Sequence, residues 1–200
     1  MVECEVRTHE ITRRLGRHFN GPDAVLFPGR DFNKSPHTLV TLAIRTEHRM
    51  TAMNPEMYSE RADFHKKLVD RMQAFRERVI ADGHWCDFID PASGVPFHSD
   101  SPSTFAECDE RHRFLGFEML ELGCCRAVTC ERFGQCMVLT SAFVEAPIDS
   151  LTEALSILEV DPGDAPVSSA TVPGAEDNMK NDSLGRSEGS RLERTDEGVD

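Results

Sequence analysis

Leu122-Gly123-Cys124-Cys125-Arg126-Ala127-Val128 sets two adjacent cysteines in an apolar run that is typical of a β-strand. A strand over about residues 122–131 is followed by Gly134 and by a second apolar run, 135–144, and this succession predicts an antiparallel hairpin. Successive side chains of a strand point to opposite faces, so Cys124 and Cys125 cannot look into one site. We therefore expect one thiol to be buried and the other to be available for chemistry.

The rest of the first 160 residues alternates between strand-like and helix-like patterns. The strongest helix is predicted over residues 59–82, where five large apolar side chains recur on one face, Ser59 is a candidate N-cap and Gly83 a stop signal. Such a stripe more often packs on the domain's own sheet than on a partner. Further strands are expected over residues 2–7, 37–45 and 84–90, helices over 11–19 and 151–158 with Thr8 as a cap of the first, and helical turns over 107–115. The sequence therefore predicts an α+β fold, an antiparallel sheet with flanking helices.

Charge and hydropathy limit the partners that the chain can have. The 200 residues carry a formal net charge of −13, with a sequence pI near 5.0, which argues against nucleic acid or an anionic membrane surface. No apolar run reaches the roughly 18 residues of a membrane helix, and the N-terminus has no basic or apolar leader, so we expect a soluble cytoplasmic protein. Residues 161–200 contain ten acids, four bases and no aromatic residue, and are predicted to be a disordered acidic tail behind a domain at 1–160.

The seven cysteines are expected to be reduced thiols, because their number is odd and no secretion signal precedes them. No CxxC pair occurs, so neither a zinc ribbon nor a thioredoxin-type site is supported. A cysteine in an apolar strand is often only a small buried hydrophobe. If Cys124 faces outward, however, Arg126 shares its face and favours the thiolate, which is a soft metal ligand.

The segment from Asp109 to Arg113 is the other candidate for chemistry. It has the composition of an acid–base cluster, but a solvated helical face with local ion pairs is the more common meaning of such a run. The histidines are scattered without metal-ligand spacing, and no phosphate-binding glycine loop or serine nucleophile elbow occurs. From residue chemistry alone, the chain is a soluble α+β domain with a vicinal cysteine pair.

Two long segments resemble a known family. Gly83-His84-Trp85-Cys86-Asp87-Phe88-Ile89-Asp90-Pro91-Ala92-Ser93-Gly94 and Glu107-Cys108-Asp109-Glu110-Arg111-His112-Arg113-Phe114-Leu115-Gly116-Phe117, followed by Leu122-Gly123-Cys124-Cys125, are similar to the methylmalonic aciduria and homocystinuria type D protein family, the cobalamin trafficking protein CblD. The resemblance covers about residues 2–150. His112 stands where the family has tyrosine, and Cys86 where it has a small residue.

The resemblance implies a vitamin B12 trafficking adaptor rather than an enzyme, with a fold similar to flavin-dependent nitroreductases but without flavin. It implies pairing with the cobalamin-processing type C protein and delivery toward methionine synthase or mitochondrial methylmalonyl-CoA mutase. The first cysteine of the family's GCC motif coordinates cobalt of the partner-bound cobalamin, and that residue is Cys124 here. We expect Cys125 to pack into the protein. Supporting roles are expected for Leu122, Gly123, Cys125, Arg126 and Asp109.

Two other classes compete with the adaptor. A flavin- or thiol-dependent oxidoreductase of the related fold would be revived by a yellow, flavin-containing preparation. A metal-free scaffold, whose cysteines are only core residues, predicts normal behaviour when Cys124 is replaced by serine. The cytoplasm is the expected location because the chain shows no mitochondrial leader, and the mitochondrion is the alternative.

Overall fold

Two buried strands, β3 (Thr38–Arg45) and β7 (Met137–Val144), form the centre of a four-stranded antiparallel sheet in the computed structural model. Their sequences are β-branched and apolar almost throughout, and every residue except Arg45 is buried, which requires cover on both faces of the sheet. The polar side chains within them are satisfied internally. Thr41 Oγ1 and Ser141 Oγ, for example, share a hydrogen bond of 2.9 Å between the two strands.

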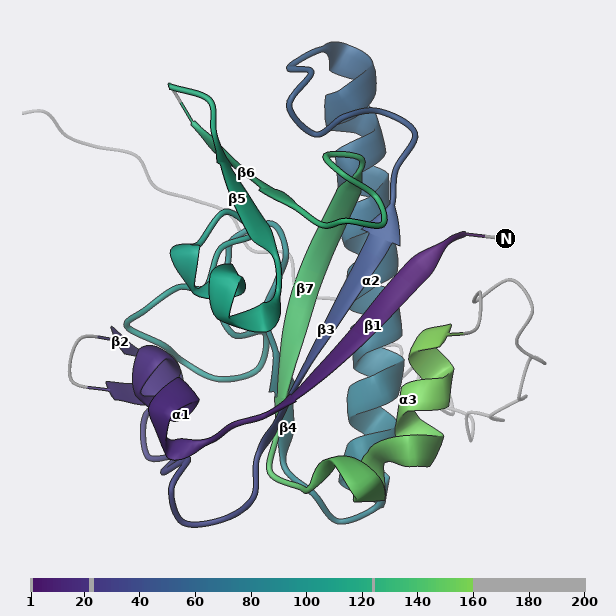
Figure 1. Cartoon of the computed structure of the whole chain (residues 1–200). Helices are drawn as coiled ribbons and strands as arrows, with labels where there is room; N and C mark the ends of the chain where they lie inside the picture. The colour runs from purple at the N-terminus through teal and green to yellow at the C-terminus, as the bar shows by residue number, and fades with distance from the viewer. Residues whose placement is uncertain (1, 22–23, 124, 160–200) are drawn as a thin grey trace, which may run out of the picture. The chain divides into compact units, whose positions relative to one another are not determined.

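The structure describes residues 2–21, 24–123 and 125–159. Cys124 and the predicted acidic tail lie outside these described residues. The elements follow in the order β1 (Cys4–Glu10), α1 (Arg13–Asn20), β2 (Ala24–Val25), β3, α2 (Pro55–Ala81), β4 (Cys86–Phe88), η1 (Glu110–Leu115), β5 (Glu118–Glu121), β6 (Arg126–Thr129), β7, η2 (Ile148–Leu151) and α3 (Thr152–Glu159) (Figure 1). The predicted α+β class, an antiparallel sheet with flanking helices, is confirmed.

The main sheet has the order β1-β3-β7-β4, and each of its faces is covered by a separate apolar cluster. On one face lie α2 and α3, whose buried side chains include Leu68, Phe75 and Leu158 (Figure 1). On the other face lie α1, the loops around residues 26–32, η1 and the small β5–β6 sheet. The apolar cluster on this α1 side of the sheet is rich in phenylalanine, and Phe143 of β7 packs at its centre.

The long helix begins earlier than the sequence predicts. Its N-cap is Asn54, whose side chain accepts from Met57 N at 2.9 Å, and Pro55 occupies the first turn, where a missing N–H costs nothing. The expected cap at Ser59 is therefore wrong, because Pro55 acts as a helix starter. The predicted stop is confirmed at Gly83, which has φ +86°. Similarly, β1 runs to Glu10 through its pairing with β3, so that Thr12 rather than Thr8 caps α1.

The predicted hairpin between residues 122–131 and 135–144 is wrong. β6 pairs with β5, whereas β7 pairs with β3 over eight residues and with β4 over three. The tight turn itself does form, with Gly134 at φ +57° and a bridge between Cys130 and Gly134. Pairing with a buried central strand removes far more apolar surface from water than a local hairpin does, and it therefore overrides the short sequence separation.

Candidate functional site

Cys125 belongs to the tip of the β5–β6 hairpin, together with Leu122 and Gly123. Leu122 N donates to Cys125 O at 2.9 Å, and this hydrogen bond lies immediately beyond the last paired residues, Glu121 and Arg126. Gly123 has φ +80°, a backbone conformation that glycine adopts without strain. Leu122 is 38% exposed, and Cys125 is also exposed. The tip therefore presents apolar and thiol groups to the outside.

This geometry corrects the expectation for Cys125. We expected this side chain to pack, because strand alternation would have placed the two cysteines on opposite faces. Leu122, Gly123 and Cys125 lie outside β5 and β6, so the strand alternation does not apply to Cys125, which is exposed. The expectation for Cys125 is wrong. Cys124 itself lies outside the described residues, and its selection as the functional thiol stays a prediction.

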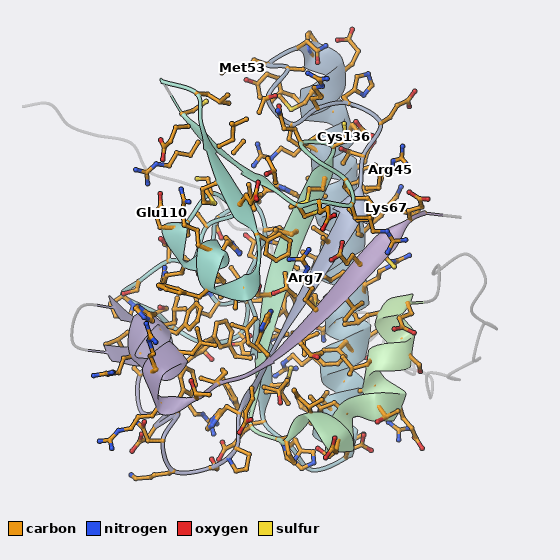
Figure 2. The ribbon with its side chains drawn as sticks, in the orientation of Figure 1. Arg7, Arg45, Met53, Lys67, Glu110 and Cys136 are labelled. Atoms are coloured by element: carbon orange, nitrogen blue, oxygen red, sulfur yellow. The ribbon has the colours of Figure 1, made fainter. Side chains whose placement is uncertain are left out.

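Arg126 follows the tip and contacts two carboxylates. Its guanidinium lies 3.1 Å from Glu110 Oε1 and 3.1 Å from Glu121 Oε1, with all three side chains about half exposed. Figure 2 labels Glu110, which belongs to η1. Pairs this exposed stabilise a fold by at most about 1 kcal/mol, so their main effect is to orient the hairpin toward η1. These two carboxylates neutralise much of the positive charge of Arg126.

Asp109 holds the segment that supports the hairpin. Its carboxylate caps η1 by accepting from Arg111 N at 2.9 Å and also pairs with the Arg111 guanidinium at 2.7 Å. Burial raises the pKa of Asp109, but the hydrogen bonds and charge of Arg111 outweigh it and lower the pKa overall. The same guanidinium donates to His18 O of α1 at 3.2 Å and lies 4.9 Å from the Phe105 ring centre. Asp109 therefore orients Arg111, which links α1 to η1.

A small cavity opens beside the hairpin, on the side toward α2 and β7. It measures about 140 Å³, and one wall is the ion pair between Arg61 and Glu107. Cys108, at its rim, is exposed. Its lining residues are Met50, Arg61, Glu107, Cys108, Arg126, Ala127, Val128 and Met137. Our sequence reasoning missed Arg61, Glu107 and Cys108, although the last two stand directly before Asp109.

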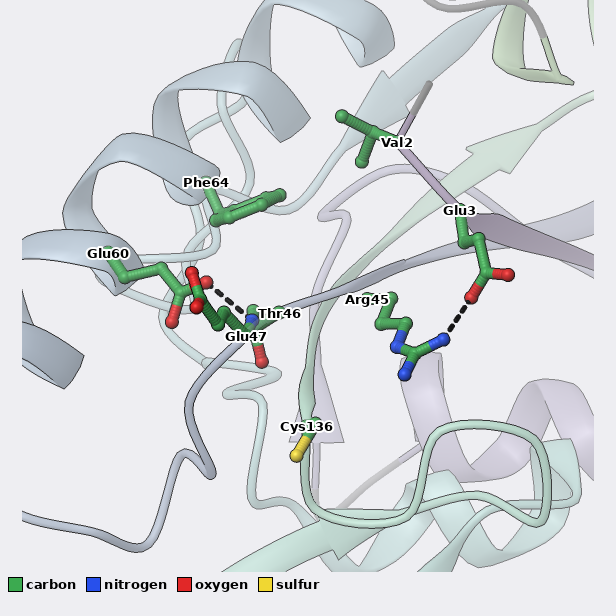
Figure 3. Close-up of a pocket in the computed structure, with 8 residues that line it drawn as sticks. All are labelled: Val2, Glu3, Arg45, Thr46, Glu47, Glu60, Phe64 and Cys136. Atoms are coloured by element: carbon green, nitrogen blue, oxygen red, sulfur yellow. Dashed lines mark hydrogen bonds and ion pairs between the residues drawn. The ribbon is translucent and has the colours of Figure 1, made fainter.

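A larger, open pocket of about 660 Å³ lies near the start of β1 (Figure 3). Its charged groups are engaged with one another: Arg45 Nη1 lies 2.6 Å from Glu3 Oε2, and a carboxylate oxygen of Glu60 accepts from Glu47 N at 2.6 Å. Cys136 is the thiol of this pocket. Because these polar groups already have partners, the pocket is the weaker candidate, and Cys136 is useful as a reference thiol.

The turn after β4 positions the segment that leads to η1. Gly94 has φ +75°, and its carbonyl accepts from Phe105 N at 2.6 Å. A Cβ on Gly94 would lie 2.9 Å from Ala106 Cα, a backbone atom that cannot move away cheaply. We expect Gly94→Ala to lower the free energy of unfolding, measured in urea, by about 1–3 kcal/mol. Gly83→Ala is the matched control, because its φ is +86° but nothing lies within 4 Å. Equal losses in both variants would show that the contact with Ala106 contributes nothing.

Within the described ranges 2–21, 24–123 and 125–159, no three His, Cys, Asp or Glu side chains come close enough together to hold a metal ion. None of the helices in those same ranges combines the length and the apolar character needed to cross a membrane.

Fold and site together define an α+β domain that carries an exposed, thiol-bearing hairpin. The sequence model of the family "Methylmalonic aciduria and homocystinuria type D protein" matches residues 21–155, and the chain belongs to this family. It is 35% identical over 150 residues to the "Cobalamin trafficking protein CblD" of Rattus norvegicus and 32% identical to that of Homo sapiens. Each alignment covers 74% of this chain and 48% of the relative, so the chain spans about half the length of the curated relatives it matches.

Proposed function

We propose that the chain is a cobalamin trafficking adaptor that presents a cysteine thiolate to the cobalt of its cargo. The observation that carries the proposal is the tip of the β5–β6 hairpin, which exposes Leu122 and Cys125 in a chain that belongs to the CblD family. The relatives are named for cobalamin trafficking, which supports a role in carrying rather than converting the cofactor.

The hairpin suits the chemistry of the cargo. A corrin holds cobalt by four equatorial nitrogens and leaves axial positions for other ligands, and a thiolate is a soft axial ligand. The tip lies at the end of two paired strands, and its described side chains, Leu122 and Cys125, are exposed. We assign the ligand to Cys124. Because Cys125 is exposed, it is the rival ligand that any experiment must separate from Cys124.

The finer parts of the proposal follow from the family resemblance. Residues 1–160 form the trafficking domain, with a nitroreductase-like α+β fold that holds no flavin, and it acts in the cytoplasm. The domain pairs with the type C protein, which holds and processes cobalamin, and it directs the cofactor toward methionine synthase or methylmalonyl-CoA mutase. The same surface that carries Leu122 and Cys125 meets the partner. No observation on the described residues favours the oxidoreductase alternative.

Visible absorption tests the ligand directly. We expect the type C partner loaded with cob(II)alamin to develop a cobalt–thiolate band when the purified chain is added. The band should persist with Cys125→Ser and vanish with Cys124→Ser, because only a sulfur ligand changes the cobalt spectrum in this way. Ligation requires the thiolate, so the band should weaken as the pH is lowered.

The two serine variants control for one another, because they change neighbouring thiols in the same turn. Loss of the band with Cys125→Ser alone would transfer the ligand role to Cys125. A stable complex with no spectral change would refute cobalt ligation. The absence of both complex and spectral change would refute the adaptor function.

A further inference from the structure

The cavity of about 140 Å³ lies against the outer edge of β6. Three consecutive β6 residues line it, Arg126, Ala127 and Val128, and no residue of β5 does. The opposite walls come from α2, through Arg61, and from the start of β7, through Met137. Figure 1 shows β6 on the side of the hairpin that faces these elements. The cavity thus occupies the place where a third strand would join the small sheet.

The hydrogen-bond pattern shows which backbone groups face this cavity. Leu122 N donates to Cys125 O, so every second pair along the hairpin is hydrogen-bonded and the pairs of Arg126 and Val128 are not. The N–H and C=O of Arg126 and Val128 therefore point away from β5. Cys130, two residues further on, follows the same pattern, because its N–H donates to Gly134 O on the outer side.

The outward backbone groups of Val128 have no hydrogen-bond partner in the part of the chain that the structure describes, although the residue is only 6% exposed. An N–H or C=O that faces this cavity needs a polar partner, which is water in the free chain and a polar group of the ligand when one is bound. A primary carboxamide matches this demand. Its oxygen accepts from the Val128 N–H while its NH₂ group donates to the Val128 C=O, two bonds to one extended residue.

The other walls fit the same group. Met50 and Met137 offer flexible apolar contact to a short methylene arm. Arg61 is engaged by Glu107 and also donates to His65 Nε2 at 3.5 Å, so the cavity does not present a bare cation that would select an anion instead. A volume of about 140 Å³ holds a short side arm but is small for the several residues of an added strand.

We propose that this cavity binds a primary carboxamide, and that the carboxamide is a peripheral amide arm of the cobalamin carried by the partner. The second half rests on the proposed function. Corrin rings carry such arms around their edge. Val128 lies four residues after Cys124, which is at most about 14 Å of extended chain, so cobalt at the tip and an arm in the cavity are compatible in reach.

Cysteine footprinting tests the proposal with the full chain. Alkylation rates of Cys108, at the cavity rim, and of Cys136, in the open pocket, are followed by peptide mass spectrometry. We expect the partner loaded with cob(II)alamin to slow Cys108 alkylation about tenfold or more while Cys136 alkylation is unchanged, because the arm covers only Cys108. Unchanged alkylation of Cys108 in a complex that shows the cobalt–thiolate band would overturn the inference but leave the proposed function intact.

The cobalamin-free partner distinguishes the source of the carboxamide. Equal protection of Cys108 with and without cobalamin would assign the cavity to an Asn, a Gln or a strand of the partner, and would overturn the cobalamin assignment. Protection that needs cobalamin supports it.

A filled cavity provides an independent measurement. Cys108→Trp places an indole at the exposed rim, and Cys136→Trp does the same in the open pocket as a matched control. We expect Cys108→Trp to weaken the loaded complex about tenfold or more by titration, since the two bonds to Val128 are lost, and Cys136→Trp to leave it unchanged. Equal affinities for both variants would count against the proposal.

Discussion

Phe143→Ala should lower the free energy of unfolding by about 3–5 kcal/mol, with a fall in Tm of about 6–20 °C. Phe143 is fully buried, and its ring lies 4.9 Å from that of Phe27 and 5.1 Å from that of Phe19. Alanine would leave a cavity in the middle of these rings, which cannot collapse because the backbone of β7 is fixed by strands on both sides. Urea unfolding and thermal melts followed by circular dichroism measure the loss.

Phe97→Ala is the comparison for this measurement. Phe97 is 45% exposed and makes a stacked contact with Phe88 at 4.8 Å, so its truncation should cost about 1 kcal/mol or less. A similar loss in both variants would mean that the phenylalanine cluster around Phe143 is not the centre of the domain's stability. The cluster also contains Phe105, which precedes η1, so Phe143→Ala should also disturb the segment that supports the hairpin.

Acid should destabilise the domain by about 2 kcal/mol between pH 7.5 and 5 through His112 alone. Burial lowers the pKa of His112 from 6.5 to about 4. Between pH 6.5 and 4, His112 therefore binds a proton in the unfolded chain but not in the folded chain. The stabilisation present above pH 6.5 is lost as the pH falls toward 4. His65, whose pKa burial and Arg61 also lower to about 4, adds a smaller loss of the same sign because it is partly exposed.

His112→Phe should reduce this pH dependence, as read from urea midpoints at a series of pH values. The ring stacks on Phe105 at 4.3 Å, so phenylalanine retains the packing and removes the proton site. His98→Phe, at an exposed histidine, should retain the dependence of the parent chain. Burial raises the pKa of Glu107, which acts with the opposite sign as the pH falls. A parent slope that His112→Phe leaves unchanged would show that His112 is not the titrating group.

His112 and Glu107 also share a small internal void. It measures about 10 Å³, and both His112 Nδ1 and Glu107 Oε1 are buried without a hydrogen-bond partner among the described residues. His112 Nε2 contacts Ala106 O at 3.2 Å, which places its proton on that nitrogen and leaves Nδ1 as an acceptor. A void of this size holds about one water molecule, which would serve both atoms.

The sequence predicts the elements of this fold well where periodicity is strong, and poorly where distant pairing decides. The apolar runs of β3, β7 and α2 were sufficient to find them, because a buried strand and an amphipathic helix leave clear patterns. The predicted pairing of β6 with β7 is wrong because strand pairing depends on the apolar surface that is buried across the sheet. A local sequence pattern carries no information on that surface. The cap at Asn54 was missed because Pro55 favours a break and a helix start equally from sequence alone.

The same distinction between local patterns and distant contacts holds for the residues of the candidate site. The glycine before the two cysteines and the resemblance point to residues 122–125, and the structure places Leu122, Gly123 and Cys125 at an exposed tip. Strand alternation predicts that Cys125 is buried. This prediction is wrong because Cys125 lies outside β6, which begins at Arg126, and is exposed. Arg61 could not have been found, since it reaches Glu107 from a helix 46 residues earlier in the chain. Tertiary contacts of this kind have no signature in a single sequence.

The separation of the two sheets has a consequence for how the tip can change. The β5–β6 pair is not joined to the main sheet by strand pairing, and its base is held by Met119 and Val128 packing into the shared core. Leu122, Gly123 and Cys125 lie beyond that base and outside both apolar clusters of the domain. If the tip ligates cobalt as proposed, replacing its ligand cysteine by histidine would alter the metal preference of the tip while the packing of Met119 and Val128 remains unchanged.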